Sequence, residues 1–220
     1  MEHTNKEESV NQEEFLNLSS YNFERFAEAD FLLRSGVHIQ NHKSQRKIYE
    51  FIEDNINPLK NFYDRLYKAK LYEQPTVDNK YFYLDAEESQ NKILNKTKLE
   101  QDVTLFALFL FWLNKVEKRF SFYLTKQELV EVLNTNHRIK PHIHKLYFVT
   151  EKEDTLSVQK TIENWVNKSL VKLEKLGWVY FQEDNEKFEI LPAFDRIATI
   201  YSEVIYDIDN IKTNYELQNQ

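Results

Sequence analysis

The sequence predicts a mainly α-helical protein with small β-hairpins, an α+β class built as two similar modules in series. Only two glycines and four prolines occur among 220 residues, so few tight turns are available and long helices are expected. Apolar residues recur at steps of three and four in several stretches, which is the spacing of one helix face. At two places such a helix is followed by a pair of short, aromatic-rich strands.

The first module follows a polar, acidic arm over residues 1–18, which has too few apolar residues to offset the entropy cost of ordering it. The first helix is predicted from Phe23 to Arg34. It ends at Gly36, because glycine readily adopts the left-handed conformation that commonly closes a helix. Its predicted buried residues are all apolar: Phe23, Phe26, Phe31 or Ala27, and Leu33.

A short β-like segment, two helices and a hairpin complete the first module. Their predicted ranges are Val37 to Ile39, Ser44 to Asp54, Ile56 to Ala69, and a hairpin with strands Leu71 to Glu73 and Tyr81 to Leu84. The polar residues from Gln74 to Lys80 form the turn of that hairpin. The module is therefore predicted to end in a β-hairpin that directly follows its third helix.

The second module begins after a polar joint from Glu87 to Lys98. The helix predicted from Thr97 to Lys115 contains a strong apolar run that is far shorter than the ~20 residues needed to cross a bilayer, so it is expected to be buried. Thr125 is followed three residues later by Glu128, the capping-box pattern that starts a helix. The segment from Asn134 to Phe148 is a less regular insertion.

The stretch from Val158 to Leu191 organises the second module. Its first half is a helix with one apolar face: Ile162, Val166, Leu170, Leu173 and Leu176. Gly177 is the predicted end of this helix. Two strands follow, Trp178 to Gln182 and Lys187 to Leu191, around a four-residue polar turn, and a last helix is predicted from Ala193 to Tyr206.

A helix, a tight stop and a hairpin in this order are the second half of a winged helix. The earlier LYEQPTVDNKYFYL repeats the strand, polar turn and strand of WVYFQEDNEKFEIL, so the sequence predicts tandem winged helices. The predicted domains are residues 19–95 and 96–206, with a loose tail over residues 207–220.

Lysines recur on the long helix of the second module and are candidate DNA contacts: Lys160, Lys168, Lys172 and Lys175. Such a row of ammonium groups could neutralise phosphates without reading bases. The alternative is a solvated face, since lysine is common at exposed helix positions and Glu163 and Glu174 dilute the row.

Composition argues against several classes of function. The net charge of -7 opposes a surface built wholly for nucleic acid. With no cysteine there is no thiolate catalysis and no disulfide, which fits a reducing cytoplasm, and no signal peptide is expected from the polar first residues. Both glycines end helices, so none remains for a phosphate-binding loop, and no paired carboxylates or Ser, His and Asp arrangement stands out. We expect neither an enzyme nor a bound cofactor.

The metal-like cluster is a group of three histidines, His137, His142 and His144. Arg138 and Lys140 would repel a cation there, and no carboxylate lies in register, so we expect an exposed loop and no metal site.

Several landmarks in chain order carry a resemblance to a known family: LRSGVHI at 33–39, FYDR at 62–65, YFYL at 81–84, QK at 159–160, SL at 169–170, LEKLG at 173–177 and KF at 187–188. Over about residues 20–200 the chain resembles MukE and its relative MksE, the winged-helix (kite-type) subunits of bacterial SMC condensin complexes.

The resemblance implies a non-enzymatic, cytoplasmic and nucleoid-associated subunit that dimerises and binds a MukF- or MksF-like kleisin. Through the kleisin it would join a MukB- or MksB-like SMC ATPase in chromosome condensation, organisation and segregation. It also implies a basic helix before the second wing, where Lys172 and Lys175 match the pattern and Glu174 stands at a commonly basic position. In the first module, Val37 stands where MukE has a basic residue. The residues that contact the kleisin are not identified by any motif.

Two alternatives remain open. One is a subunit of a related SMC-type complex that acts in plasmid defence. The other is a free-standing winged-helix transcriptional regulator that binds DNA, which would favour arginine, asparagine and glutamine on the long helix and a basic domain. That helix has no arginine and the chain is acidic, so the subunit is favoured.

Overall fold

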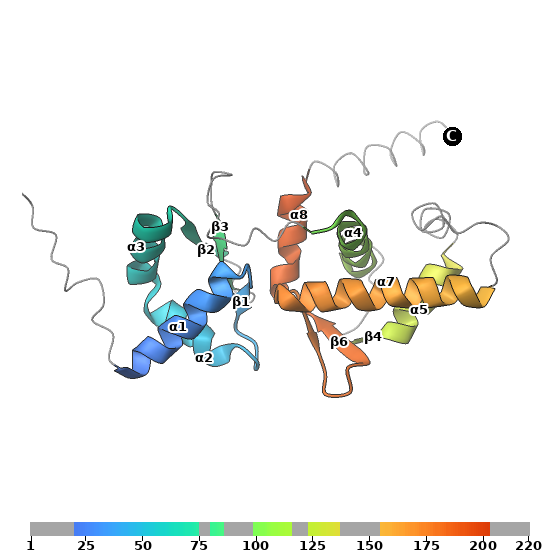
Figure 1. The fold of residues 1–220 in the computed structure, drawn as a ribbon, viewed down its shortest axis with the longest axis horizontal. Helices are drawn as coiled ribbons and strands as arrows, with labels where there is room; N and C mark the ends of the chain where they lie inside the picture. The colour runs from blue at the N-terminus through green and yellow to red at the C-terminus, as the bar shows by residue number, and fades with distance from the viewer. Residues whose placement is uncertain (1–19, 75–79, 86–98, 116–122, 137–154, 203–220) are drawn as a thin grey trace, which may run out of the picture. The chain divides into compact units, whose positions relative to one another are not determined.

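The computed structural model describes residues 20–74, 80–85, 99–115, 123–136 and 155–202 (Figure 1). The chain divides into two compact units, the first made of residues 1–75 and 81–96 and the second of residues 76–80 and 97–220. The fold combines helices with two small antiparallel sheets, as the sequence predicts. Within the described ranges, no helix is both long enough and apolar enough to span a membrane.

The first unit has three helices and a three-stranded sheet, in the order helix, strand, helix, helix, strand, strand. The elements are α1 (Ser20–Arg34), β1 (Ile39–Gln40), α2 (Arg46–Asp54), α3 (Ile56–Tyr67), β2 (Lys70–Gln74) and β3 (Tyr81–Asp85). The strands lie in the order β1-β3-β2 and all pairs are antiparallel. The sheet register pairs Ile39 with Phe82 and Tyr72 with Tyr83.

The core of the first unit lies between the helices and one face of this sheet. Leu33, Ile52, Tyr63 and Phe82 are fully buried in it. The predicted inward face of α1 was wrong in part, because Phe23 is 57% and Phe31 is 65% exposed. The apolar residues of α1 lie on several sides of the helix, so spacing alone did not identify the buried side, which centres on Ala29 and Leu33.

The second unit repeats the same order of described elements. They are α4 (Gln101–Lys115), β4 (Leu124–Thr125), α5 (Lys126–Thr135), α7 (Thr155–Lys175), β5 (Val179–Phe181) and β6 (Lys187–Ile190), followed by the 3-10 helix η2 (Pro192–Asp195) and α8 (Arg196–Ile200). The sheet order is β4-β6-β5, again antiparallel. In Figure 1 the long helix α7 runs beside α4 and α5, and it packs against both.

The predicted local signals at the helix ends are confirmed. Gly36 and Gly177 have positive φ values of 83° and 69°. After each helix two backbone hydrogen bonds close the last turn: Val37 N to Leu32 O and Gly36 N to Leu33 O, then Trp178 N to Leu173 O and Gly177 N to Glu174 O. This is the Schellman arrangement, which satisfies the last carbonyls of the helix.

The capping box of α5 is also confirmed. The Glu128 N–H donates to the Thr125 hydroxyl at 3.1 Å, and the Thr125 N–H donates to the Glu128 carboxylate at 2.8 Å. The hydrogen bonds that the Thr125 N–H and then the Thr125 hydroxyl donate to the Glu128 carboxylate lower the pKa of Glu128, because they favour its charged form. The cap fixes where α5 begins, and therefore which of its sides faces α7.

Several predicted boundaries shift. The helix α3 ends at Tyr67 instead of Ala69, because Lys68 takes the left-handed conformation at φ 50°. The helix α7 begins at Thr155, three residues before the predicted stretch. The predicted helix from Ala193 opens as η2 and continues as α8. The arm, the joint between modules, the three-histidine cluster and the C-terminal tail lie outside the described residues.

Candidate interaction surface

The helix α7 packs between α4 and α5, and its flanks toward these two helices carry different polar residues. Its buried face includes Ile162, Val166, Leu170 and Leu173. The flank toward α4 carries Trp165 and Lys168, which hydrogen bond to the start of α4. The flank toward α5 carries Gln159 and Glu163. The two flanks therefore differ: one is bonded to the start of α4, and the other carries a carboxylate beside α5.

The four candidate lysines do not share one environment. Lys160 and Lys175 are exposed and Lys172 is half-buried. None of these three forms an ion pair with another described residue. Lys168, in contrast, is held between two carboxylates of another helix. Three of the predicted cations are thus available to solvent or a partner, and one is already neutralised within the chain.

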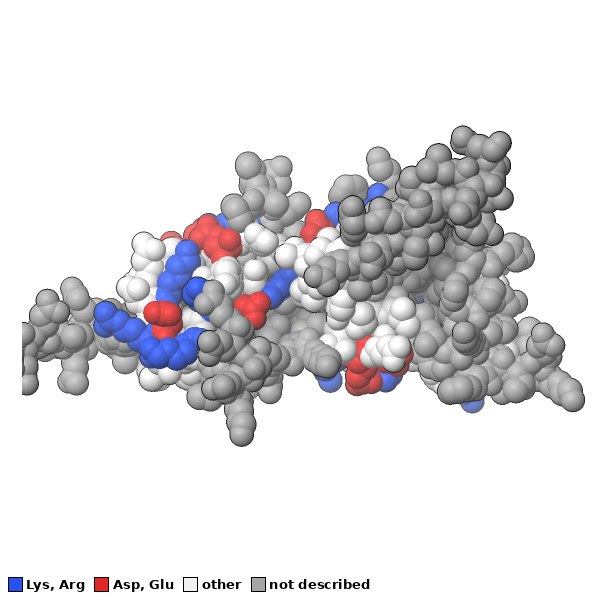
Figure 2. Space-filling model, turned by 90° about the horizontal axis from the view of Figure 1, so that it is seen from above, with Lys and Arg blue, Asp and Glu red and all other residues white. Residues whose placement is uncertain are grey.

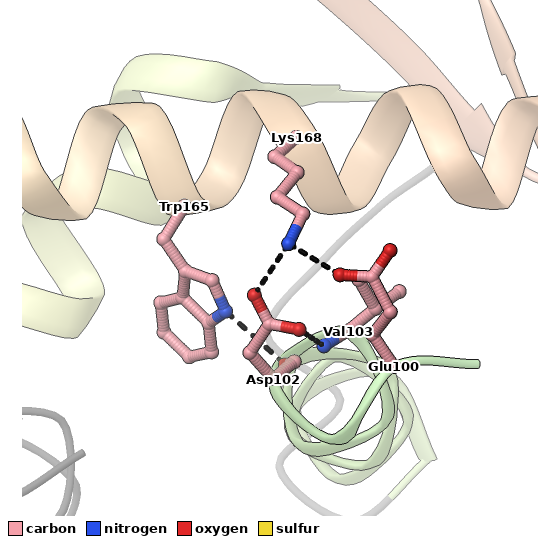
Figure 3. A network of polar contacts seen from close by, with 5 residues as sticks. All are labelled: Glu100, Asp102, Val103, Trp165 and Lys168. Atoms are coloured by element: carbon pink, nitrogen blue, oxygen red, sulfur yellow. Dashed lines mark hydrogen bonds and ion pairs between the residues drawn. The ribbon is translucent and has the colours of Figure 1, made fainter. Parts of the chain in front are cut away.

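The contacts of Lys168 are shown in Figure 3. Its Nζ donates to Glu100 Oε2 at 2.6 Å and to Asp102 Oδ2 at 3.0 Å. The hydrogen bonds to Glu100 and then to Asp102 raise the pKa of Lys168. Burial acts to raise the pKa of Asp102, but hydrogen bonds from Lys168 and from the Val103 N–H outweigh it and lower that pKa. A phosphate could reach Lys168 only in competition with two carboxylates.

Trp165 adds a second link at the same place. Its indole Nε1–H donates to the backbone oxygen of Asp102 at 3.1 Å, and its ring packs edge-on against Phe106 at 5.5 Å. The side chain is only 4% exposed. Trp165 and Lys168 together tie α7 to the first turn of α4, where Asp102 also interacts favourably with the helix dipole. Sequence reasoning missed this network, because Trp165 and Lys168 lie more than 60 residues from Glu100 and Asp102.

The hairpin that follows α7 has an acidic tip. Glu183, Asp184, Asn185 and Glu186 are all exposed. Asp184 Oδ1 accepts hydrogen bonds from the N–H groups of Glu186 and Lys187 at 3.0 and 3.1 Å, which lower the pKa of Asp184. Asn185 adopts φ 54°, so it makes the tight turn. Three carboxylates at this tip oppose contact with a DNA backbone.

A groove of about 510 Å³ runs between α5 and α7, beside this turn. Its lining residues come from three segments: Lys126, Gln127, Val130, Glu131, Asn134 and Thr135 of α5, Gln159, Glu163, Val166 and Asn167 of α7, and Glu186 of the turn. No aromatic residue lines it among the described residues. Sequence reasoning missed the groove, because it depends on how two separate helices pack.

The space-filling view in Figure 2 shows basic and acidic residues interspersed over the described part of one face. No broad basic field is visible there. Among the described residues, no group of three or more histidine, aspartate or glutamate side chains is arranged to hold a metal ion.

The first unit adds an exposed apolar stripe on α1. Phe23, Ala27 and Phe31 are exposed and lie four residues apart, so they line one side of the helix. Large apolar side chains gathered on a helix face commonly mark a protein contact.

Comparison with known proteins identifies the family. No curated protein sequence matches this chain. A family model does match residues 24–199, which span both units and include most of α1, the long helix α7 and its hairpin. That model describes the condensin complex protein MksE. The resemblance in the sequence landmarks is thereby confirmed, and the chain belongs to the MksE family of condensin complex proteins.

Proposed function

We propose that this chain is a non-enzymatic, cytoplasmic subunit of a MukBEF- or MksBEF-like SMC condensin complex that binds the kleisin and contributes to chromosome organisation and segregation. The match of residues 24–199 to the condensin protein MksE carries this proposal. Its kleisin would connect it to the SMC ATPase and to the nucleoid.

We interpret each compact unit as a winged-helix domain. Both units have the described order of helix, strand, helix, helix and hairpin, and in both sheets the first strand pairs with the last. In this interpretation α3 and α7 are the recognition helices, and the β2–β3 and β5–β6 hairpins are the wings.

The charge around α7 favours a complex subunit over a free-standing regulator. Base reading relies on arginine, asparagine and glutamine in the groove and on a basic domain. Here α7 contains no arginine, its most central lysine is paired with Glu100 and Asp102, and the adjacent wing tip carries three carboxylates. DNA contact by this surface would be weak and would depend on the rest of the complex.

A homodimer is part of the proposal, and α1 offers a self-complementary surface for it. The spacing of Phe23, Ala27 and Phe31 is symmetric about Ala27. Two copies of α1 packed antiparallel about a two-fold axis would set each Phe23 against Phe31 of the second copy, with the small Ala27 residues at the crossing. Light scattering with Phe23→Gln/Phe31→Gln should show a monomer at concentrations where the parent chain and Val171→Gln, a control on the second unit, are dimers. Unchanged mass would contradict this assignment.

The complex is tested by co-expressing the tagged chain with a kleisin of the same organism. We expect the two to co-elute in size-exclusion chromatography. Separate elution at micromolar concentrations, together with tight and sequence-specific duplex binding by the chain alone, would overturn the proposal in favour of a regulator. Deleting the gene then separates chromosomal from plasmid-defence roles: loss of chromosome segregation supports the first, and improved retention of a test plasmid with normal segregation supports the second.

A further inference from the structure

The groove between α5 and α7 has acidic walls and an apolar floor. Val130 and Val166 form the floor and are 8% and 1% exposed. Glu131 on α5, Glu163 on α7 and Glu186 on the turn supply carboxylates from three sides. Among the described residues that line the groove, Lys126 is the one cation. The net formal charge of these described lining residues is therefore negative.

The carboxylates are held in place by neutral neighbours. The Gln127 amide donates to Glu131 Oε1 at 3.1 Å, and the Gln159 amide donates to Glu163 Oε1 at 3.0 Å. Neither carboxylate forms an ion pair with a described residue. The two glutamates are thus oriented by amide groups and not paired with a described cation, so a cationic group of a partner could pair with them.

Lys126 does not neutralise the groove as a whole. Its Nζ lies 5.0 Å from the Phe181 ring centroid and 4.0 Å from Glu186 Oε1, so it is drawn to the hairpin end of the groove. The backbone N–H of Lys126 also donates to the backbone carbonyl oxygen of Glu186 at 3.0 Å, which holds the turn beside the start of α5. Glu131 on α5 and Glu163 on α7 are therefore left without a described cation as partner.

We propose that this groove binds a basic segment of a partner polypeptide, with an arginine or lysine head between Glu131 and Glu163 and its aliphatic stem on Val130 and Val166. Long cationic side chains characteristically bury their stems on apolar surface while the head stays solvated. Carboxylates on facing helices suit the several donors of a guanidinium or ammonium group. Asn134 and Asn167 supply amide donors and acceptors for the backbone of the same segment.

The charge of the groove excludes the other common occupants. A nucleic-acid backbone or an acidic peptide would meet Glu131, Glu163 and Glu186 at close range and be repelled. The groove volume of about 510 Å³ is far larger than a metal ion and lies within the range of pockets that take an organic ligand. This inference goes beyond condensin membership, since it names a chemistry of partner and does not depend on the kleisin.

The test measures peptide binding by the full-length chain. The probe is a fluorescein-labelled nonapeptide of alternating arginine and alanine, followed by anisotropy, with an alternating glutamate and alanine peptide as the negative probe. Glu131→Gln/Glu163→Gln removes the groove charge. Glu174→Gln/Glu183→Gln is the matched control, because it removes two exposed carboxylates of the same unit that do not line the groove. Asn167→Trp fills the groove without any change of charge.

We expect the arginine peptide to bind the parent chain and the control double variant within about twofold of each other. The groove double variant should weaken binding by roughly tenfold or more, because it removes charge-assisted contacts. Asn167→Trp should weaken binding by a similar factor, because the indole ring occupies the space that the peptide needs. Equal weakening by both double variants would show only general attraction and would overturn the proposal. No effect of Asn167→Trp, equal binding of the glutamate peptide, or no binding of the arginine peptide would also overturn it. Kleisin co-elution is a separate measurement, so failure here leaves the proposed complex unaffected.

Discussion

The pairing of Lys168 leads to a specific prediction about how α7 contacts DNA. If the helix meets a duplex, the phosphates should be neutralised by Lys160, Lys172 and Lys175, and not by Lys168. Lys168 is already hydrogen bonded to Glu100 and Asp102, at 2.6 and 3.0 Å. The other three lysines have no such partner among the described residues.

The number of lysines that contact phosphates can be measured from how strongly the DNA affinity depends on salt concentration. Each neutralised phosphate of duplex DNA contributes a slope of about −0.9 to log K against log salt concentration. Three lysines therefore predict a slope of about −2.7, and four predict about −3.6. Between 50 and 200 mM salt, affinity should fall roughly 40-fold with three contacts and roughly 150-fold with four.

The assay is anisotropy of a labelled duplex titrated with the chain, alone and with its kleisin, over that salt range. The slope is more informative than the affinity, because Lys168→Gln also frees two carboxylates that repel DNA at every salt concentration. We expect Lys168→Gln to leave the slope unchanged. Each of Lys160→Gln, Lys172→Gln and Lys175→Gln should make the slope about 0.9 less negative.

Two results would refute this reasoning. The first is a Lys168→Gln slope that changes as much as that of the other single variants, which would mean that its ion pairs open on binding. The second is a triple variant of Lys160, Lys172 and Lys175 with the parent slope, which would place any DNA contact elsewhere on the chain.

Three further predictions concern the elements that position this surface. Gly177→Ala should lower the free energy of unfolding by about 1–2 kcal/mol, since φ 69° is unfavourable for a residue with a Cβ, as urea unfolding would measure. Trp165→Phe should lower it by about 1 kcal/mol through loss of the hydrogen bond to the Asp102 backbone, measured in the same way. Glu128→Gln should flatten the rise of stability with pH at and below about 4.5 in acid unfolding experiments. The folded-state pKa of Glu128 lies below its ordinary 4.5, so the unfolded state binds more protons, and the stabilisation is present above that value and lost as the pH falls.

Each of these has a control. Gly177→Asn should cost less than Gly177→Ala, because asparagine tolerates the left-handed conformation, and the reverse order would contradict the backbone argument. Trp112→Phe serves as the matched change on α4, where the tryptophan is half-buried; an equal loss there would assign the effect of Trp165→Phe to ring size. For the pH experiment, Thr125→Val removes the side-chain hydrogen bond to the Glu128 carboxylate and should flatten part of the same rise; an unchanged rise would contradict the cap argument.

The parts of the fold that could be predicted from sequence are those fixed by short-range chemistry. The closing residues Gly36 and Gly177 and the Thr125–Glu128 cap each depend on neighbours within a few positions, so the sequence alone identifies them. The prediction of the buried side of α1 was wrong in part, because Phe23, Phe26 and Phe31 are chemically alike. Only tertiary packing decides that Phe26 lies against Phe62 while Phe23 and Phe31 are exposed.

The candidate site was harder to predict because its properties arise from pairs of distant residues. The spacing of the lysines on α7 is correct as helix geometry, but the state of Lys168 depends on Glu100, which is 68 residues away. The groove likewise depends on which sides α5 and α7 turn toward each other. The periodicity of residues along one helix predicts neither the ion pairs of Lys168 nor the groove.

The charges on α7 also indicate how its surface is divided. One flank is engaged by α4 through Trp165 and Lys168, and the other borders a groove with uncompensated glutamates. The lysines that are not engaged by α4, Lys160, Lys172 and Lys175, remain for a polyanion. Three point charges without an arginine cannot discriminate between base sequences, although they can strengthen a contact that other subunits have already positioned. The proposed function needs only this second property, because a complex subunit does not have to select a DNA sequence by itself.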